Sequence, residues 1–193
     1  NDVQGVWASL DSPLQWVKPE LTATIQWDSL PIPDPLATLP PKYLPEQLLR
    51  HSAQLTDKRM EGRGMGSEGL QQSALYIADQ FRIAGLQPVA GTYLQYWQDS
   101  RAGYGNIEMT NVVGMIPGIN RALSAQPVVL GAHYDHLGID SDSGEIYPGA
   151  DDNASGISIL IEVAAKLSRS YTPQRPILFV AFTGEESGLI GSQ

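Results

Sequence analysis

The stretch from Leu130 to Asn153 reads LGAHYDHLGIDSDSGEIYPGADDN, and a second acidic stretch, FTGEES, follows at residues 182–187. Between Arg121 and Lys166 the sequence has no lysine or arginine, yet it carries the carboxylates Asp135, Asp140, Asp142, Glu145, Asp151, Asp152 and Glu162. Carboxylates gathered in a folded segment need a counter-charge or a metal ion. The pattern therefore predicts that this segment binds a cation.

The sequence around these stretches alternates between strand and helix patterns. Residues 127–132, PVVLGA, form a continuous apolar run that is typical of a strand buried on both faces of a sheet. Residues 154–169 have a helical apolar stripe, and residues 175–183, RPILFVAFT, predict a second buried strand. This order predicts two parallel strands joined by a right-handed crossover. Both acidic stretches then lie at the carboxyl edge of the sheet, where open α/β sheets bind ligands.

The upstream residues predict elements that pack against this sheet. Residues 45–57 begin with a proline and have leucines at near-helical spacing, and residues 69–84 have a one-sided apolar stripe that ends at Gly85. Residues 88–118 change to a strand pattern bounded by glycine and proline. The glycine-rich residues 60–69, MEGRGMGSEG, lack the order of a phosphate-binding loop and predict a structural turn.

The composition limits the classes of partner. The chain has 193 residues, of which 42% are hydrophobic and 17% charged, and its formal net charge is −9. These values suit an α/β protein and disfavour nucleic acid or an anionic membrane surface as partner. Because there is no cysteine, a metal ion would be bound by His, Asp and Glu. No apolar run approaches the roughly 18 to 20 residues that a membrane-spanning helix needs.

Residues 1–44 predict an N-terminal arm or strap ahead of a domain at residues 45–193. The arm contains Trp7, Trp16 and Trp27 and ends in a proline-dense run that excludes helix and central strand. Aromatic residues more often pack than bind, so we expect the tryptophans to anchor the arm.

Two groups of residues could carry chemistry after the first predicted strand. His133 would leave the end of that strand, and Asp135 lies close enough in sequence to hold its ring by a hydrogen bond. Taken alone, these residues could equally cap a strand. Asp151 and Asp152 come just before a helix, where capping is an equally good interpretation in isolation.

A third group, Glu185 and Glu186, favours a metal site. The two residues follow the second strand, and adjacent side chains point in different directions, so one can bind a metal while the other acts as a base. Imidazole and carboxylate ligands suit Zn, Mn or Co, and their mixture favours zinc. A carboxylate that bridges two ions would make a two-metal hydrolase site, with a free carboxylate beside the attacking water as general base.

Three motifs carry a family resemblance. GAHYDHLG, GADDNASG and AFTGEESGLIGSQ, in this order, resemble the co-catalytic zinc aminopeptidases of the bacterial leucyl aminopeptidase type in peptidase clan MH. The segment KRMEGRGMGSEGLQQSALYIADQFRIAGLQP is similar to the one before the catalytic sheet in bacterial members, so the resemblance covers residues 45–193. It implies a three-layer αβα fold with a mostly parallel or mixed central sheet. The implied activity is a metallopeptidase that releases N-terminal residues from peptides.

The resemblance also implies a role for each candidate residue. His133 is implied to bind one zinc ion and Asp135 to orient it. Asp152 is implied to bridge two zinc ions, with a cis peptide bond following it, and Glu186 to bind the second ion. Glu185 is implied to be the general base.

Members of this family complete the site with a further acidic ligand and a last histidine, both beyond Gln193. We therefore expect these residues to be the N-terminal part of a longer enzyme, with the fold incomplete at its C-terminus and inactive or nearly so by itself. Neither His51 nor His136 has a pattern that makes it a substitute ligand. The start at Asn1 rather than Met, together with the resemblance, favours a secreted or periplasmic protein.

Two other functions share parts of this pattern. A glutaminyl cyclase is a single-zinc acyltransferase with the same fold and similar His, Asp and Glu positions. A binding domain of the receptor type would keep the fold without a working site. The intact GADDNASG motif and the paired glutamates favour the peptidase.

Overall fold

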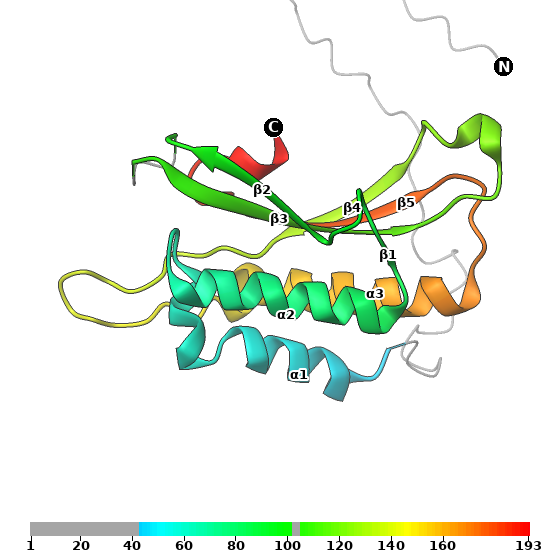
Figure 1. Cartoon of the computed structure of the whole chain (residues 1–193). Helices are drawn as coiled ribbons and strands as arrows, with labels where there is room; N and C mark the ends of the chain where they lie inside the picture. The colour runs from blue at the N-terminus through cyan, green and yellow to red at the C-terminus, as the bar shows by residue number, and fades with distance from the viewer. Residues whose placement is uncertain (1–42, 102–104) are drawn as a thin grey trace, which may run out of the picture. The chain divides into compact units, whose positions relative to one another are not determined.

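A computed structural model of the chain describes residues 43–101 and 105–193 (Figure 1). The predicted arm at residues 1–44 lies outside these ranges, apart from its last two residues, and its role stays a prediction. Within the described residues, no helix is long and apolar enough to cross a bilayer.

The helices form where apolar residues recur at a spacing that places them on one face of a helix. They are α1 (Pro45–Leu55), α2 (Glu68–Ala84) and α3 (Ser155–Ser170). In Figure 1 all three lie on the same side of the sheet. The predicted helices at 45–57, 69–84 and 154–169 are confirmed to within two residues at each end.

The ends of α2 show why the sequence forms a helix there. Ser67 accepts a hydrogen bond from the amide of Leu70 at 3.0 Å, which satisfies one donor of the first turn. Gly85 ends the helix in the left-handed conformation, with φ of 83°. A residue without a Cβ adopts this φ at little cost, so the predicted glycine stop is confirmed.

The sheet is mixed. The strand order is β1, β3, β5, β4, and β2 also pairs with β3. Strands β4 and β5 are parallel, and all other pairs are antiparallel. Its strands are β1 (Gln87–Pro88), β2 (Leu94–Asp99), β3 (Ile107–Ile116), β4 (Val128–His133) and β5 (Ile177–Phe182). The predicted α/β class and the predicted parallel pair are therefore confirmed.

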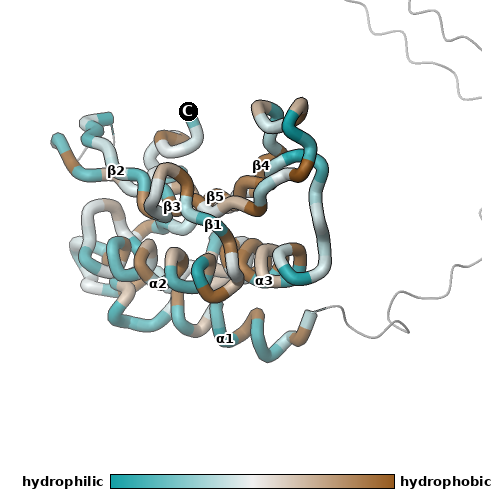
Figure 2. The backbone as a smooth tube through the Cα atoms, turned by 45° about the vertical axis from the view of Figure 1, so that its right-hand side comes forward, coloured by the Kyte–Doolittle hydropathy of each residue, from teal (hydrophilic) through white to brown (hydrophobic). Residues whose placement is uncertain are grey.

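The core lies between the sheet and helices α2 and α3. Phe81 of α2 meets Phe179 of β5 edge to face, with ring centroids 6.4 Å apart, and both side chains are fully buried. Val112 of β3 and Ile157 of α3 are buried in the same cluster. Figure 2 shows the apolar character of β4 and β5 beside these helices. Burying such side chains contributes roughly 1.5–3 kcal/mol each, which fixes the sheet on the helical layer.

One strand prediction is wrong. The run at residues 127–132 was expected to be buried on both faces, but Val128 and Val129 are 45% and 52% exposed. Among the described strands β4 pairs with β5 alone, so it forms an edge of the sheet. The described helices cover one face of the sheet, and the other face of β4 is therefore open. β5 has strands on both sides and is mostly buried.

Two short helical turns connect the larger elements near the carboxyl edge. A 3₁₀ helix at Lys58–Arg63 precedes α2, which agrees with the turn predicted ahead of that helix. A π-type turn at Ala150–Ala154 leads into α3. The remaining short turns, both 3₁₀, are Arg121–Leu123 and Ile190–Ser192.

Candidate metal centre

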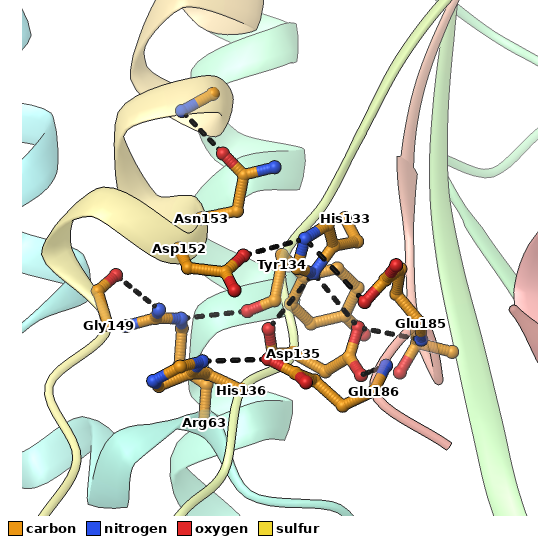
Figure 3. Close-up of polar contacts among 12 residues, drawn as sticks. Arg63, His133, Tyr134, Asp135, His136, Gly149, Asp152, Asn153, Glu185 and Glu186 are labelled. Carbon is orange, nitrogen blue, oxygen red and sulfur yellow. Dashed lines mark hydrogen bonds and ion pairs between the residues drawn. The ribbon is translucent and has the colours of Figure 1, made fainter. Parts of the chain in front are cut away.

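His133 is the last residue of β4, opposite Phe182 of β5 in the parallel register. Its Nε2 lies 3.0 Å from Oδ1 of Asp152 and 3.8 Å from Oε2 of Glu185. Three predicted site residues, from three separate segments, thus meet at the carboxyl edge of the sheet (Figure 3). Parallel strands end at the same edge, and this is the physical reason why the convergence could be predicted.

Asp135 is buried beneath this group. Its two carboxylate oxygens accept hydrogen bonds from the amides of Glu185 at 3.2 Å and Glu186 at 3.1 Å. The same carboxylate lies 3.7 Å from Nδ1 of His133, which is longer than a hydrogen bond. The nearer acceptor for that nitrogen is the backbone oxygen of Asp135, at 3.2 Å. In this structure Asp135 therefore fastens the loop after β5 more directly than it fastens the ring of His133.

The electrostatics of His133 follow from its neighbours. The Asp135 carboxylate is the main cause that raises the pKa of His133 above its ordinary value. Partial burial lowers it, and the charges of Glu185 and Asp152 raise it further. The negative charges that raise this pKa also favour a metal ion at the same place.

Asp152 enters the site from the turn before α3. Its side chain points toward His133 in Figure 3 and is largely open to solvent. The peptide bond between Asp152 and Asn153 is cis, as the family resemblance implied. In the first turn of α3, the side-chain oxygen of Asn153 accepts from the amide of Gly156 at 2.9 Å. Asn153 thus fills the capping role that sequence left open for Asp151 or Asp152.

The two glutamates after β5 point to different partners, as predicted. Glu185 faces His133, whereas Oε1 of Glu186 lies 2.8 Å from Nδ1 of His136. Asn111 of β3 holds the loop that carries them. Its side-chain oxygen accepts from the amide of Thr183 at 3.0 Å, and its side-chain nitrogen donates to the carbonyl of Gly191 at 2.8 Å.

Arg63 holds the other side of the site and has no exposed surface. Its guanidinium donates to four backbone carbonyls, those of Tyr134 at 2.8 Å, Leu55 at 2.7 Å, Pro148 at 2.8 Å and Gly149 at 2.8 Å. Burial is the main cause that lowers the pKa of Arg63 to about 10, and the charges of Asp135 and Asp152 oppose this shift. The arginine therefore joins the loop after β4 to the turn before Asp152 and places a positive charge beneath the carboxylates.

The side chains that could hold a metal ion lie on both sides of Asp152. Ligand atoms of His136, Asp152 and Glu186 all lie within 4.8 Å of one another. His133 is not part of that group, but it contacts the Asp152 carboxylate from the opposite strand end. Imidazole nitrogen with carboxylate oxygen is the donor set of zinc sites, so the residues present fit this metal.

Sequence reasoning missed three residues of this region: Arg63, Asn111 and His136. His136 was set aside, although it follows His133 by three residues in the same loop. That spacing was the available signal. Both contacts of Asn111 and three of the four carbonyl contacts of Arg63 involve residues more than 70 positions away, which no local pattern reveals.

The remaining acidic residues of the loop after β4 lie outside the candidate metal centre. Oδ1 of Asp140 accepts from the amides of Asp142 and Ser143 at 3.1 and 2.7 Å. Asp142 and Glu145 are exposed. These carboxylates stabilise or surround the loop, and they do not join the cluster around Asp152.

The structure thus combines a mixed α/β sheet with histidine and carboxylate side chains gathered at its carboxyl edge. Residues 111–193 match the family model described as Peptidase family M28. The matched segment is less than half of the chain.

Two curated relatives are similar to this chain in sequence. The alkaline phosphatase isozyme conversion protein of Escherichia coli (strain K12) is 30% identical over 143 residues, which cover 68% of this chain and 40% of the relative. A probable leucine aminopeptidase of Trichophyton verrucosum (strain HKI 0517) is 35% identical over 88 residues, which cover 43% of this chain and 23% of the relative. The chain thus spans less than half the length of these relatives.

Solved structures share the fold. A Zn-dependent exopeptidase from Parabacteroides distasonis ATCC 8503 has a TM-score of 0.58 and 21% identity, and the match covers 75% of this chain and 48% of that one. A glutaminyl cyclase from Tannerella forsythia has a TM-score of 0.57 and 23% identity with the same coverage. Zinc exopeptidases and glutaminyl cyclases therefore share this fold, and the fold alone does not distinguish the two functions.

Proposed function

We propose that the protein is a zinc-dependent aminopeptidase of the bacterial leucyl aminopeptidase type in clan MH, which hydrolyses the N-terminal residue from peptides. The position of Asp152 carries this proposal. Its carboxylate contacts His133 on one side and belongs to the cluster with His136 and Glu186 on the other. A carboxylate between two potential ligand groups is what a bridged pair of ions requires.

In this proposal His133 would hold one zinc ion, Glu186 would hold a second, and Asp152 would be shared between them. The ions, when bound, supply Lewis acidity and bring the pKa of an attacking water toward neutrality. Glu185 is the general base. It faces His133 and Asp152 from the end of β5, where it can take a proton from the attacking water and pass it to the leaving amine.

Asp135 positions the two glutamates of the site. Because it accepts from the amides of both Glu185 and Glu186, it sets where the base and the ligand stand relative to each other. Its charge also favours a cation beside His133. The proposal thus gives Asp135 two positioning roles.

The alternative is a glutaminyl cyclase-like acyltransferase with a single zinc ion. The likeness to solved glutaminyl cyclases favours it, although at 23% identity or less this likeness concerns the fold. Asp152 contacts His133 on one side and shares a cluster with Glu186 on the other, an arrangement that supports two ions and so favours the peptidase.

Metal content and two substrates separate these functions. We expect the full-length enzyme to bind two zinc ions per chain, measured by plasma emission spectrometry, and to release leucine from a leucyl peptide. One zinc ion per chain with cyclisation of an N-terminal glutaminyl peptide would overturn the proposal. Asp142→Asn is the matched control, because it removes an exposed carboxylate of the same loop and should leave both results unchanged.

A further inference from the structure

His136 has a contact that the proposed roles do not use. Its Nδ1 lies 2.8 Å from Oε1 of Glu186, and Figure 3 shows the two side chains facing each other across the site. His136 follows β4, and Glu186 follows β5. The contact therefore joins the two loops that carry the site, 50 positions apart in the sequence.

The ring of His136 is confined on several sides. Its backbone amide donates to the carbonyl of Arg63 at 3.0 Å. The ring packs so closely on Gly149 that a Cβ at that position would collide with its Cδ2 atom. Gly149 itself is held by Arg63. A ring fixed in this way presents Nδ1 in one direction, toward Glu186.

The distance decides between two roles for this ring. Two ligand atoms bound at about 2 Å to one tetrahedral zinc ion lie roughly 3.3 Å apart. A charge-assisted hydrogen bond from N–H to a carboxylate is about 2.7–2.9 Å long. The observed 2.8 Å matches the hydrogen bond. His136 thus donates from Nδ1 to Oε1, which leaves Oε2 of Glu186 free to bind an ion.

We propose that His136 is a positioning residue that holds the Glu186 carboxylate so that a single oxygen binds zinc. This inference rests on the proposed metal centre. Glu186 is then fixed twice, because Asp135 accepts from its backbone amide and His136 donates to its carboxylate. Hydrogen bonds of this kind to metal ligands typically raise metal affinity by 10- to 100-fold.

The test compares two substitutions in the full-length protein. His136→Leu removes the donor, and we expect the weaker zinc ion to bind roughly 10- to 100-fold less tightly in competition with a chelator. His136→Asn puts an amide N–H close to the place of Nδ1, and we expect zinc affinity within about threefold of the wild type. Leu137→Ala, at the exposed neighbouring residue, is the control for changes in the loop.

A second readout excludes a purely structural role. The metal-free His136→Leu and wild-type proteins should unfold at similar temperatures, whereas the zinc-dependent rise in Tm should be smaller in the variant. Zinc affinity unchanged in His136→Leu would overturn the inference. So would an equal loss in His136→Asn and His136→Leu, since that would make the imidazole a ligand. A wild-type protein that binds no zinc would instead overturn the proposed function on which this inference rests.

Discussion

Asp135 and Asp152 both lie in acidic loops at the carboxyl edge of the sheet, but their surroundings differ. The Asp135 side chain is 1% exposed, and backbone amides occupy both of its oxygens. The Asp152 side chain is 62% exposed and faces His133. A carboxylate whose lone pairs are taken by amides has a structural role, whereas one with open lone pairs is available to a cation.

The same contrast separates the whole site into two layers. The scaffold consists of the buried residues Arg63, Asn111 and Asp135, which bond mainly to backbone groups. The rim consists of the residues that face the open edge, namely His133, His136, Asp152, Glu185 and Glu186. We expect scaffold substitutions to change stability and rim substitutions to change metal binding or turnover.

The largest effect is expected for Asp152→Asn. An amide oxygen is neutral and a weak metal ligand, so the variant should lose both zinc ions and roughly 10⁴-fold or more in turnover. Metal analysis and peptide hydrolysis check this together. Full zinc occupancy in the variant would mean that another residue bridges the ions.

Glu185→Gln should separate chemistry from binding within the rim. Removal of the proposed base should lower turnover by about 10²- to 10⁴-fold, while zinc content stays that of the wild type. Glu186→Gln is the matched comparison and should lose zinc. If the two variants exchange these results, the roles of the adjacent glutamates are reversed.

Arg63→Met tests the scaffold. The substitution leaves four carbonyl oxygens without their buried donor, and the free energy of unfolding should fall by about 3 kcal/mol or more. Arg59→Met is the control. Arg59 has a side chain that is 72% exposed and pairs with Asp57, so its loss should cost less than about 1 kcal/mol. Equal losses in urea unfolding would contradict the distinction between the two layers.

The smallest effect concerns a buried polar group away from the site. His51 contacts the hydroxyl of Tyr76 at 2.6 Å and Glu162 at 3.0 Å, and burial lowers its pKa although Glu162 opposes this shift. A lowered pKa means that the unfolded chain binds the proton more readily. This residue therefore destabilises the fold as the pH drops below its ordinary value of 6.5.

His51→Gln should accordingly reduce the loss of unfolding free energy between pH 7 and pH 5. Urea unfolding at both pH values measures this difference. Zinc affinity at pH 7 should not change, because His51 belongs to α1 and contacts α2 and α3 rather than the rim. A change in zinc affinity would contradict this separation, because it would show that His51 influences the metal centre without contacting it.

Sequence patterns predicted the parts of this fold that depend on local periodicity. The stripe and glycine stop of α2, the parallel pair and the meeting of both acidic stretches follow from spacing and strand direction. The edge position of β4 could not be predicted, because an apolar run does not reveal how many neighbours a strand has. The spacing of His136 from His133 places both in one loop, but it does not show which way that loop turns the His136 side chain.

The hydrogen bonds of Asp135 also limit how the site can be changed. One carboxylate holds the amides of two successive residues, so the proposed base and the proposed ligand move as a single rigid dipeptide. An engineer who shifts this loop to suit another substrate would displace the acid–base group and the zinc ligand together. Changing the specificity of such an enzyme is therefore easier from surfaces that do not touch residues 183–186.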